Sequence, residues 1–580
     1  MRRRISSLGI VIVALLFWQQ GLFSPVQAQD QATTPVPPLF EDVSLQAGIT
    51  NNRRGTDKSI GQAWGDYDND GWLDLYVTDT AGPNTLYHNN QDGTFSVSPF
   101  NNLVVLPDKE SSGAGFVDYD NDGWQDLYVL NWGENVLYHN IGGTGFVDVT
   151  DTAEIGGGEA NSKTASWGDY DQDGFVDLYV ANWACYPLCG RPSTGESDRL
   201  YHNNGNGTFS DVTRLLGGMT VGAGFVASFT DYDNDNDLDI YLVNDEFINP
   251  IGNVLWRNDG PGCDGWCFVD VAAESGANTK VMGMGLAPAD YDNDGDLDFY
   301  FSNSGPMSLL QNQGNGTFVD MAQPAGVDMP QGVGWGAVFL DYDNDGWRDL
   351  YIAIAEGTGD TSTANPMFHN DGIANGVGTF TEFTTGSAVN NAGHTMGVAS
   401  GDYNNDGWVD LLVGNYDEGY FLYRNDVGTL TQNRWMAFKL VGGGPVNRDA
   451  IGAKVKVTTA DGRSQIQEVI AGSSLGAGNS LTLNFGLGSM ETADIQIIWP
   501  DGLTQSFPGV TANKQYRLGY PINPQVEAAQ RLTLYGPQPL QTEQTQATPT
   551  FYPSTLQLVL AALVFSFIVV LLVWFWRRQS

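Results

Sequence analysis

The sequence predicts an all-β protein, made of a seven-bladed β-propeller with calcium-binding loops, a small β-sandwich domain and a C-terminal transmembrane helix. An aspartate-rich loop with the pattern D-x-[DN]-x-D-[GN]-x-x-D occurs seven times. Successive loops start 51 to 62 residues apart, which is the period of a propeller blade. Few stretches have helical spacing, whereas 72 glycines and 12% aromatic residues suit short strands and tight turns.

The N-terminus has the composition of a secretory signal peptide. Arg2 to Arg4 precede an apolar stretch from Ile10 to Trp18, and Val26-Gln27-Ala28 is a small-x-small cleavage pattern. We therefore expect a signal peptide over residues 1–28 and a linker over 29–38. An uncleaved anchor is the alternative, although the apolar stretch is short for a membrane span.

The C-terminus predicts a membrane anchor. Leu558 to Trp576 is apolar, long enough to cross a bilayer, and followed by Arg577 and Arg578. We expect a Pro-, Gln- and Thr-rich stalk over 521–554, a transmembrane helix over 555–576 and a cytoplasmic tail over 577–580. By the positive-inside rule the chain is a single-pass membrane protein whose N-terminal ectodomain lies outside the cytoplasm, at the cell surface or in the periplasm. A buried core helix and a cleaved sorting tail are the alternatives.

The charge is strongly negative and concentrated in the loops. The net charge of −42, with 68 acidic and 26 basic residues, argues against nucleic acid as a partner. Twenty-seven of the acidic residues occupy positions 1, 3, 5 and 9 of the seven loops, which indicates cations as the local partners.

Each loop is a candidate site for structural Ca²⁺, up to seven in all. Odd spacing in a tight turn directs successive carboxylates inward, glycine at position 6 tolerates the bend, and position 7 offers its carbonyl. Mg²⁺ is the second choice because it prefers to keep its waters. The predicted ligands at positions 1, 3, 5 and 9 are Asp66, Asp68, Asp70 and Asp74; Asp118, Asp120, Asp122 and Asp126; Asp169, Asp171, Asp173 and Asp177; Asp231, Asp233, Asp235 and Asp239; Asp290, Asp292, Asp294 and Asp298; Asp341, Asp343, Asp345 and Asp349; Asp402, Asn404, Asp406 and Asp410.

Two loops depart from the pattern. Asn236 replaces the position-6 glycine of the fourth loop, and Asn tolerates a left-handed conformation. Asn404 replaces a charged ligand in the seventh loop, so we expect that site to be the weakest. An EF-hand is excluded because position 12, where it needs a bidentate Glu, is apolar in every copy. Metal-free acidic turns are the remaining alternative, and they are costly because like charges are crowded together.

The seventh repeat lacks a good fourth strand. A matching segment, Phe40-Glu41-Asp42-Val43, precedes the first loop, so we expect it to complete the last blade and close the ring. Four histidines, His88, His139, His202 and His369, occupy the same place in the third strand, and we interpret them as structural. We expect His394 to have a packing role.

Four cysteines form two close pairs. Cys185 with Cys189 and Cys263 with Cys267 predict two local disulfides in an exported chain, although four cysteines allow three connectivities. A zinc site is the weaker interpretation because no histidine lies near either pair.

The loops and their glycine-rich lead strands resemble the FG-GAP/VCBS repeats of integrin α-chain heads, over residues 39–433. Asn447-Arg448-Asp449-Ala450-Ile451-Gly452-Ala453, Phe485-Gly486-Leu487-Gly488 and the segment from Ile495 to Gly502 resemble the ASPIC/UnbV domain, over residues 434–520. The combination is similar to bacterial relatives of cartilage acidic protein. The resemblance implies a surface or secreted interaction protein and supplies no ligand.

The leading functional hypothesis is a non-enzymatic adhesion or recognition scaffold that binds an extracellular protein or carbohydrate. The sequence gives no indication of the oligomeric state. Gly472-Ser473-Ser474-Leu475-Gly476 matches a nucleophile elbow, but no histidine follows it to complete a triad. The alternative is an extracellular polysaccharide lyase or dehydratase built on a metal-bearing propeller. Such an enzyme would have a cluster of Lys, Arg, His or Tyr side chains that converge on one face of the propeller from non-repeating positions.

Overall fold

The computed structural model describes residues 35–49, 60–185, 197–217, 223–246, 251–263, 265–357, 364–374, 377–521 and 533–535. The predicted signal peptide, transmembrane helix and tail lie outside them. No helix among these residues combines the length and apolar character needed to cross a membrane. The described chain is all-β, and its α-helices are single turns, α1 (Thr150–Ala153), α2 (Ala272–Ser275) and α3 (Ala322–Ala325).

Up to Asn425, the described strands form seven antiparallel units of four strands each. Units 1 to 3 are β2 (Gln62–Gly65), β3 (Asp74–Val77), β4 (Thr85–Asn89), β5 (Phe95–Val97); β6 (Glu110–Val117), β7 (Asp126–Trp132), β8 (Val136–Asn140), β9 (Phe146–Asp148); β10 (Ala160–Gly168), β11 (Asp177–Cys185), β12 (Arg199–Asn203), β13 (Phe209–Asp211). A single pairing, Asn161 with Trp132, joins units 2 and 3 into one sheet.

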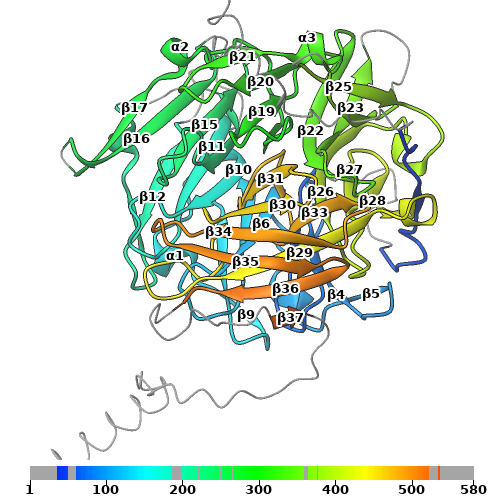
Figure 1. Cartoon of the computed structure of the whole chain (residues 1–580). Coiled ribbons are helices and arrows are strands. Elements are labelled where there is room, and N and C mark those ends of the chain that lie inside the picture. Colours follow the sequence, from blue (N-terminus) through cyan, green and yellow to red (C-terminus); the bar gives the residue numbers. More distant parts are fainter. Residues whose placement is uncertain are drawn as a thin grey trace, which may run out of the picture. The chain divides into compact units, whose positions relative to one another are not determined.

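The later units repeat the same order. Units 4 to 7 are β14 (Gly224–Thr230), β15 (Asp239–Asn244), β16 (Val254–Gly262), β17 (Gly265–Asp270); β18 (Leu286–Ala289), β19 (Asp298–Phe301), β20 (Ser308–Asn312), β21 (Phe318–Asp320); β22 (Gly332–Leu340), β23 (Asp349–Gly357), β24 (Met367–Ala374), β25 (Val377–Phe383); β26 (Thr395–Gly401), β27 (Asp410–Asn415), β28 (Gly419–Asn425) and β1 (Phe40–Asp42). In Figure 1 they follow chain order from blue through cyan and green to yellow. Four 3₁₀ turns, η1 (Asn101–Leu103), η2 (Thr213–Leu216), η3 (Ala388–Asn390) and η4 (Val427–Thr429), lie among them.

The seventh unit is completed from the other end of the chain, as the sequence predicts. Strand β1 pairs antiparallel with β28, placing Phe40 opposite Asn425. The first strands of consecutive units contact one another, and β26 contacts β2 in turn. Pairing the two ends of the repeat region leaves no open edge between the first and last units, which is the propeller-like arrangement that the repeats predict.

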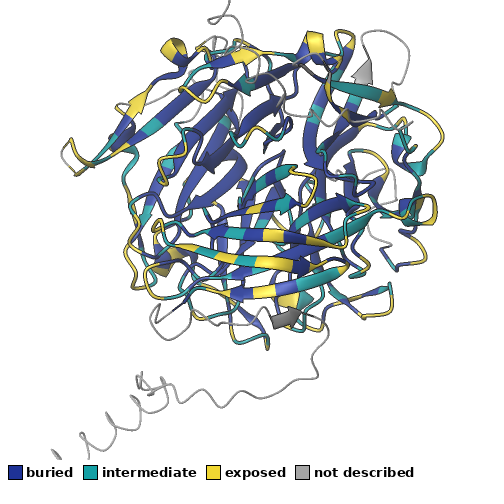
Figure 2. Cartoon of the chain, in the orientation of Figure 1, coloured by how far each residue is buried: buried dark blue, intermediate teal, exposed yellow. Residues whose placement is uncertain are grey.

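The core is divided into clusters that lie between units. Each of the seven hydrophobic clusters among the described residues contains side chains of two consecutive units, and one of them joins unit 7 to unit 1. Strands such as β10, buried at every residue, pack on both faces, whereas exposed residues concentrate at loops and outer strands (Figure 2). No unit therefore buries its apolar surface alone, which is the physical reason for a repeat array.

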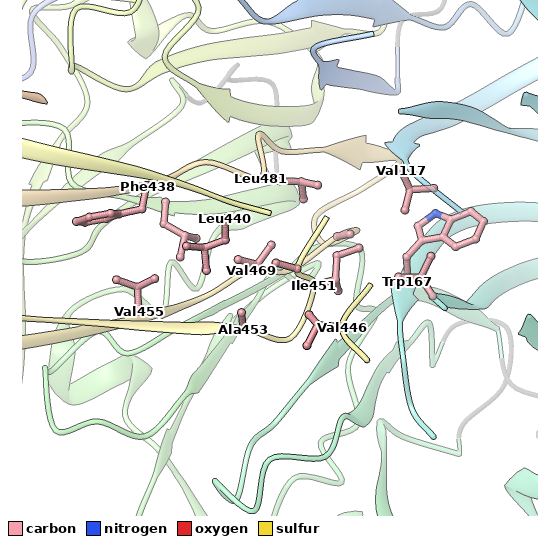
Figure 3. Close-up of a cluster of buried hydrophobic side chains, with 14 of the residues drawn as sticks. Val117, Trp167, Phe438, Leu440, Val446, Ile451, Ala453, Val455, Val469 and Leu481 are labelled. Atoms are coloured by element: carbon pink, nitrogen blue, oxygen red, sulfur yellow. The ribbon is translucent and has the colours of Figure 1, made fainter. Parts of the chain in front are cut away.

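The C-terminal domain consists of two four-stranded sheets. The first has the order β33 (Leu483–Gly488), β29 (Arg434–Val441), β36 (Lys514–Gly519), β37 (Thr533–Tyr535), and the second β31 (Ser464–Glu468), β30 (Lys454–Thr459), β34 (Thr492–Ile498), β35 (Thr504–Thr511). Phe438 and Val455, from different sheets, belong to one hydrophobic cluster that also contains Val117 and Trp167 of units 2 and 3 (Figure 3). The domain therefore shares its core with the repeat units.

Residues 470–480 of this domain reach the first strands of the repeat units. Within this segment β32 (Ala477–Gly478) pairs in parallel with β2, and Ala471 forms a bridge with Trp167 of β10. Ser474 N donates to Leu286 O, and Gly476 O accepts a hydrogen bond from Ala114 N. The segment that matches a nucleophile elbow in sequence is thus a buried connection between the C-terminal domain and four different units.

Candidate metal centres

Each acidic loop joins the first and second strands of its unit and has the same backbone conformation. Position 4 is left-handed in all seven loops, with φ between 55° and 62°, and is Asn in six copies and Gln172 in the third. Position 6 is also left-handed, with φ 90° at Gly71 and 72° at Asn236. Asn236 therefore adopts the conformation expected for a glycine replacement.

Hydrogen bonds within the loop hold the first carboxylate in place. In loop 1, Asp66 Oδ1 accepts from Asp70 N (3.0 Å) and Asp66 Oδ2 accepts from Gly71 N (3.1 Å), and the other six loops repeat both contacts. Asp70 Oδ1 accepts from Trp72 N at position 7 (2.9 Å). These hydrogen bonds hold the carboxylates of the loop close together. One oxygen each of Asp66, Asp68 and Asp74 lie within 4.8 Å of one another.

The carboxylate at position 9 fastens the loop to the third strand. Asp74 is fully buried; its Oδ1 accepts from Asn89 N (2.9 Å) and its Oδ2 from Tyr67 N (3.2 Å). All seven units repeat this pair of contacts. Position 9 therefore has a structural role that spacing alone did not indicate, and metal ligation by these residues stays a prediction.

Two sets of side-chain amides link each loop to a neighbouring loop. Asn69 Nδ2 at position 4 donates to Gly123 O of the next loop (2.8 Å), and the series continues through every loop until Asn405 donates to Gly71 O of the first (3.1 Å). In the same way Asn140 Nδ2, at the end of the third strand, donates to Tyr67 O of the preceding loop (2.7 Å), and the other six units follow. Neither set of contacts was predicted from the sequence, although the Asn that recurs at the first place in six loops and at the second in all seven units was the available signal.

Burial makes negative charge costly in these loops. Desolvation, together with repulsion from neighbouring loop carboxylates, raises the pKa of Asp66 to about 7 and that of Asp74 to about 8. In loop 6 burial, followed by repulsion from Asp345 and Asp343, holds the pKa of Asp341 well above its usual range. A divalent cation would remove this penalty by neutralising two charges at once.

The donor set fits a hard cation. Asp171, Asp233 and Asp292 occupy position 3 of loops 3, 4 and 5, and in each the Oδ1 atom is buried and accepts no hydrogen bond within the described residues. Asp292 is 7% exposed. Buried carboxylate oxygens are normally satisfied, so the same orphan at the same loop position in three units indicates a place for a ligand. Oxygen donors suit Ca²⁺, which accepts a variable coordination geometry.

Four histidines lie beside these carboxylates. His88 Nδ1 is 3.3 Å from Asp68 Oδ2 and 3.2 Å from Asp74 Oδ1, and the hydrogen bond with Asp74 raises the pKa of His88 to about 9. His139, His202 and His369 also contact loop carboxylates. His394, in contrast, contacts Asp417.

The C-terminal domain covers part of the loop surface. Asp449 Oδ2 accepts from Asp118 N (2.7 Å) of loop 2, and Lys454 Nζ donates to Asp231 Oδ2 (2.8 Å) of loop 4, where both side chains are buried. Gly488 N donates to the carbonyl of Asn344 in loop 6 (2.9 Å). Loop residues are therefore part of an intramolecular interface.

Comparison with known proteins places the chain in a family. The model of the FG-GAP-like repeat matches residues 66–117, 118–180, 188–242, 290–352 and 341–413. The chain belongs to the FG-GAP-like repeat family. The model of the ASPIC and UnbV domain matches residues 443–525, so the resemblance stated from the motifs is confirmed for both parts.

Several relatives of this FG-GAP protein are similar along most of its length. Cartilage acidic protein 1 from Homo sapiens is 25% identical over 84% of this chain and 75% of its own, and that from Xenopus tropicalis is 26% identical over 85% and 78%. Among solved structures, the BP39L lectin from Burkholderia pseudomallei aligns with a TM-score of 0.43 and 10% identity, over 64% of this chain and 96% of its own.

One cluster lies away from the loops and joins a non-repeating lysine to two tryptophans at equivalent places in units 2 and 3. Lys163 of β10 is 7% exposed, and its Nζ lies 5.6 Å from the ring centroid of Trp132 and 5.5 Å from that of Trp183. Strand β7 begins at Asp126, beside the acidic loop, and ends at Trp132. The cluster therefore lies toward the strand ends that are farthest from the loops. Desolvation lowers the pKa of Lys163 to about 8.

One predicted disulfide is confirmed. Cys263 and Cys267 are bonded to each other in unit 4. Cys189 lies outside the described residues, so its pairing with Cys185 stays a prediction.

The buried pair between Lys454 and Asp231 generates a stability prediction. The Lys454 ammonium group faces Asp231 and also stabilises the nearby Glu468 carboxylate. Lys454→Met removes this cation and leaves buried negative charge without a partner. We expect a loss of about 3–5 kcal/mol, the usual cost of breaking a buried ion pair from one side. The measurement is urea denaturation of the full-length chain, followed by tryptophan fluorescence.

Lys456→Met is the matched control, because Lys456 is exposed on the same strand. The urea concentration at the midpoint of its unfolding should equal that of the parent chain. Equal midpoints for the two variants would show that the Lys454 contact does not hold the domain in place.

Proposed function

We propose that this chain is a calcium-stabilised, seven-bladed β-propeller that serves as a recognition scaffold outside the cytoplasm, anchored in the membrane by its C-terminal segment. The seven units and the return of the hydrogen-bond series from loop 7 to loop 1 support one blade per unit. The observation that carries the calcium proposal is the set of buried position-3 oxygens without a hydrogen-bond donor. The ions would have a structural role, since each loop pins the hairpin between the first and second strands of its blade.

A calcium-binding role suits an extracellular setting. Extracellular modules bind Ca²⁺ at roughly 10⁻⁴ to 10⁻³ M, a concentration found outside cells. The signal peptide and membrane segment expected from the sequence agree with this setting.

The recognition surface in this proposal is the side of the propeller opposite the loops. The C-terminal domain occupies loop residues of units 2, 4 and 6, which removes much of that side from contact with a partner. On the other side, Trp132 is 37% exposed beside Lys163 and Trp183. Aromatic rings beside an ammonium group suit a carbohydrate, whose C–H faces stack on indoles and whose hydroxyls accept hydrogen bonds.

Metal removal tests the structural role of calcium. We expect chelation with EGTA to lower the thermal unfolding temperature of the full-length chain and Ca²⁺ to restore it, because crowded buried carboxylates repel one another without the ion. Asp292→Asn should lower the number of bound Ca²⁺ ions by about one, as measured by calorimetric titration. In EGTA the same variant should be at least as stable as the parent, because it removes one buried charge.

Glu274→Gln, at an exposed residue of α2, is the charge-matched control and should change neither quantity. An unfolding temperature that is the same with and without EGTA would contradict the structural role.

Screening the full-length chain against a glycan and polysaccharide panel tests recognition against catalysis. We expect binding without release of product, and weaker binding by Trp132→Ala, which removes the exposed indole. Leu45→Ala, at an exposed apolar residue elsewhere, is the control. Unsaturated or shortened sugar products would favour the lyase or dehydratase alternative instead.

A further inference from the structure

The residue before the last Asn of the third strand divides the seven loops into two groups. This position is His88, His139, His202 and His369 in units 1, 2, 3 and 6, and Arg257, Gln311 and Arg424 in units 4, 5 and 7. Four of the five histidines of the chain thus occupy one structural position, next to an acidic loop. The backbone of the unit does not require histidine there, since three units have other residues.

Three of the four imidazoles contact their loops with nearly identical geometry. In His88, His139 and His202 the Nδ1 atom lies 3.3–3.4 Å from Oδ2 of the position-3 aspartate and 3.1–3.2 Å from Oδ1 of the position-9 aspartate. His369 is turned, and its Nε2 lies 3.4 Å from Asp343 Oδ2 and 3.6 Å from Asp345 Oδ2, with only 6% of the side chain exposed. One nitrogen in each case faces two carboxylates of the loop.

These separations match the spacing of ligands around one ion. For metal–ligand bonds of about 2.1–2.5 Å, adjacent ligands of a six-coordinate ion lie about 3.0–3.5 Å apart. Each of these nitrogens is shared between two carboxylates: His139 Nδ1 and His202 Nδ1 are hydrogen-bonded to the position-9 aspartate and still lie 3.4 Å from the position-3 aspartate. The imidazole nitrogen is therefore placed as one more donor to the cation that the carboxylates surround.

Nitrogen donation changes which metal the loop prefers. Ca²⁺ and Mg²⁺ take oxygen ligands, whereas imidazole suits first-row transition metals. The other three loops have no such donor at this position: an arginine side chain offers only N–H groups, and Gln311 Nε2 donates a hydrogen bond to Asp292. One chain thus carries two kinds of loop.

We infer that the loops of units 1, 2, 3 and 6 bind a first-row transition-metal dication through His88, His139, His202 and His369, while the loops of units 4, 5 and 7 bind through oxygen alone. This inference rests on the proposed metal-binding function of the loops and adds a nitrogen ligand and a second class of metal to it. In this arrangement the histidine ring is neutral when the metal is bound, because the ligating nitrogen must be deprotonated.

Electron spin-echo spectroscopy of the Mn²⁺-loaded full-length chain tests the inference. We expect nitrogen hyperfine coupling from directly bound imidazole in the parent, and its loss when all four histidines are changed to Gln. The Mn²⁺ affinity at these loops should fall about tenfold or more. Glutamine is an accommodated substitute because unit 5 has Gln311 at the same position.

His394→Gln is the matched control, since this histidine pairs with Asp417 instead of a loop carboxylate. It should keep both the nitrogen coupling and the Mn²⁺ affinity. The single variant His369→Gln, which should remove one coupled Mn²⁺ site, replaces the fourfold variant if the latter does not fold.

Absence of nitrogen coupling in the parent, or coupling that persists in the histidine variants, would overturn the inference. Calcium titration of the same samples separates this failure from that of the proposed function. Loss of the nitrogen signal with Ca²⁺ binding intact would support the inference, whereas a parent that binds Ca²⁺ but shows no nitrogen signal would contradict the nitrogen ligand alone.

Discussion

The structure depends on keeping clusters of buried carboxylates close together. In each loop, backbone N–H groups bind the first, fifth and ninth positions, which fixes the geometry, but they do not neutralise the charge. The raised pKa of Asp66 and of Asp74 expresses this cost. A loop of this type is preorganised for a cation, because folding has already brought the carboxylates together and the ion does not have to gather them on binding.

The hydrogen bonds between loops explain how local sites support a whole ring. Asn69 and Asn140 each connect a loop to a neighbour through an amide–carbonyl contact, and equivalent residues repeat these contacts in the other units. Any movement of one loop therefore acts on the carbonyl groups of the loops beside it. In this account an ion bound in one unit also stabilises the adjoining units, and β1 removes the open edge that would otherwise end the series.

Much of the repeat region was predictable from the sequence because its determinants are local. The loop pattern, the left-handed Asn236 and the closing strand at Phe40 follow from spacing and residue type. The docking of the C-terminal domain was not predictable in this way, since Lys454 and Asp231 are 223 residues apart and no local pattern links them. The segment around Ser474 illustrates the same limit: its small residues matched a catalytic turn, but the structure uses them for close approach to the first strands.

The histidines show a different reason for incomplete prediction. Their repetition at one position of the third strand was visible, and a structural role was the natural interpretation. Only the fold shows that this position faces positions 3 and 9 of the loop, which places His88 between Asp68 and Asp74.

Anomalous X-ray diffraction from crystals of the full-length chain grown with Ca²⁺ tests the central claim most directly. We expect an anomalous peak inside each of the seven loops, in contact with the position-3 side-chain oxygen, and the weakest peak at Asn404. Loops that hold their carboxylates in the same geometry without any anomalous peak would contradict the claim that cations neutralise them.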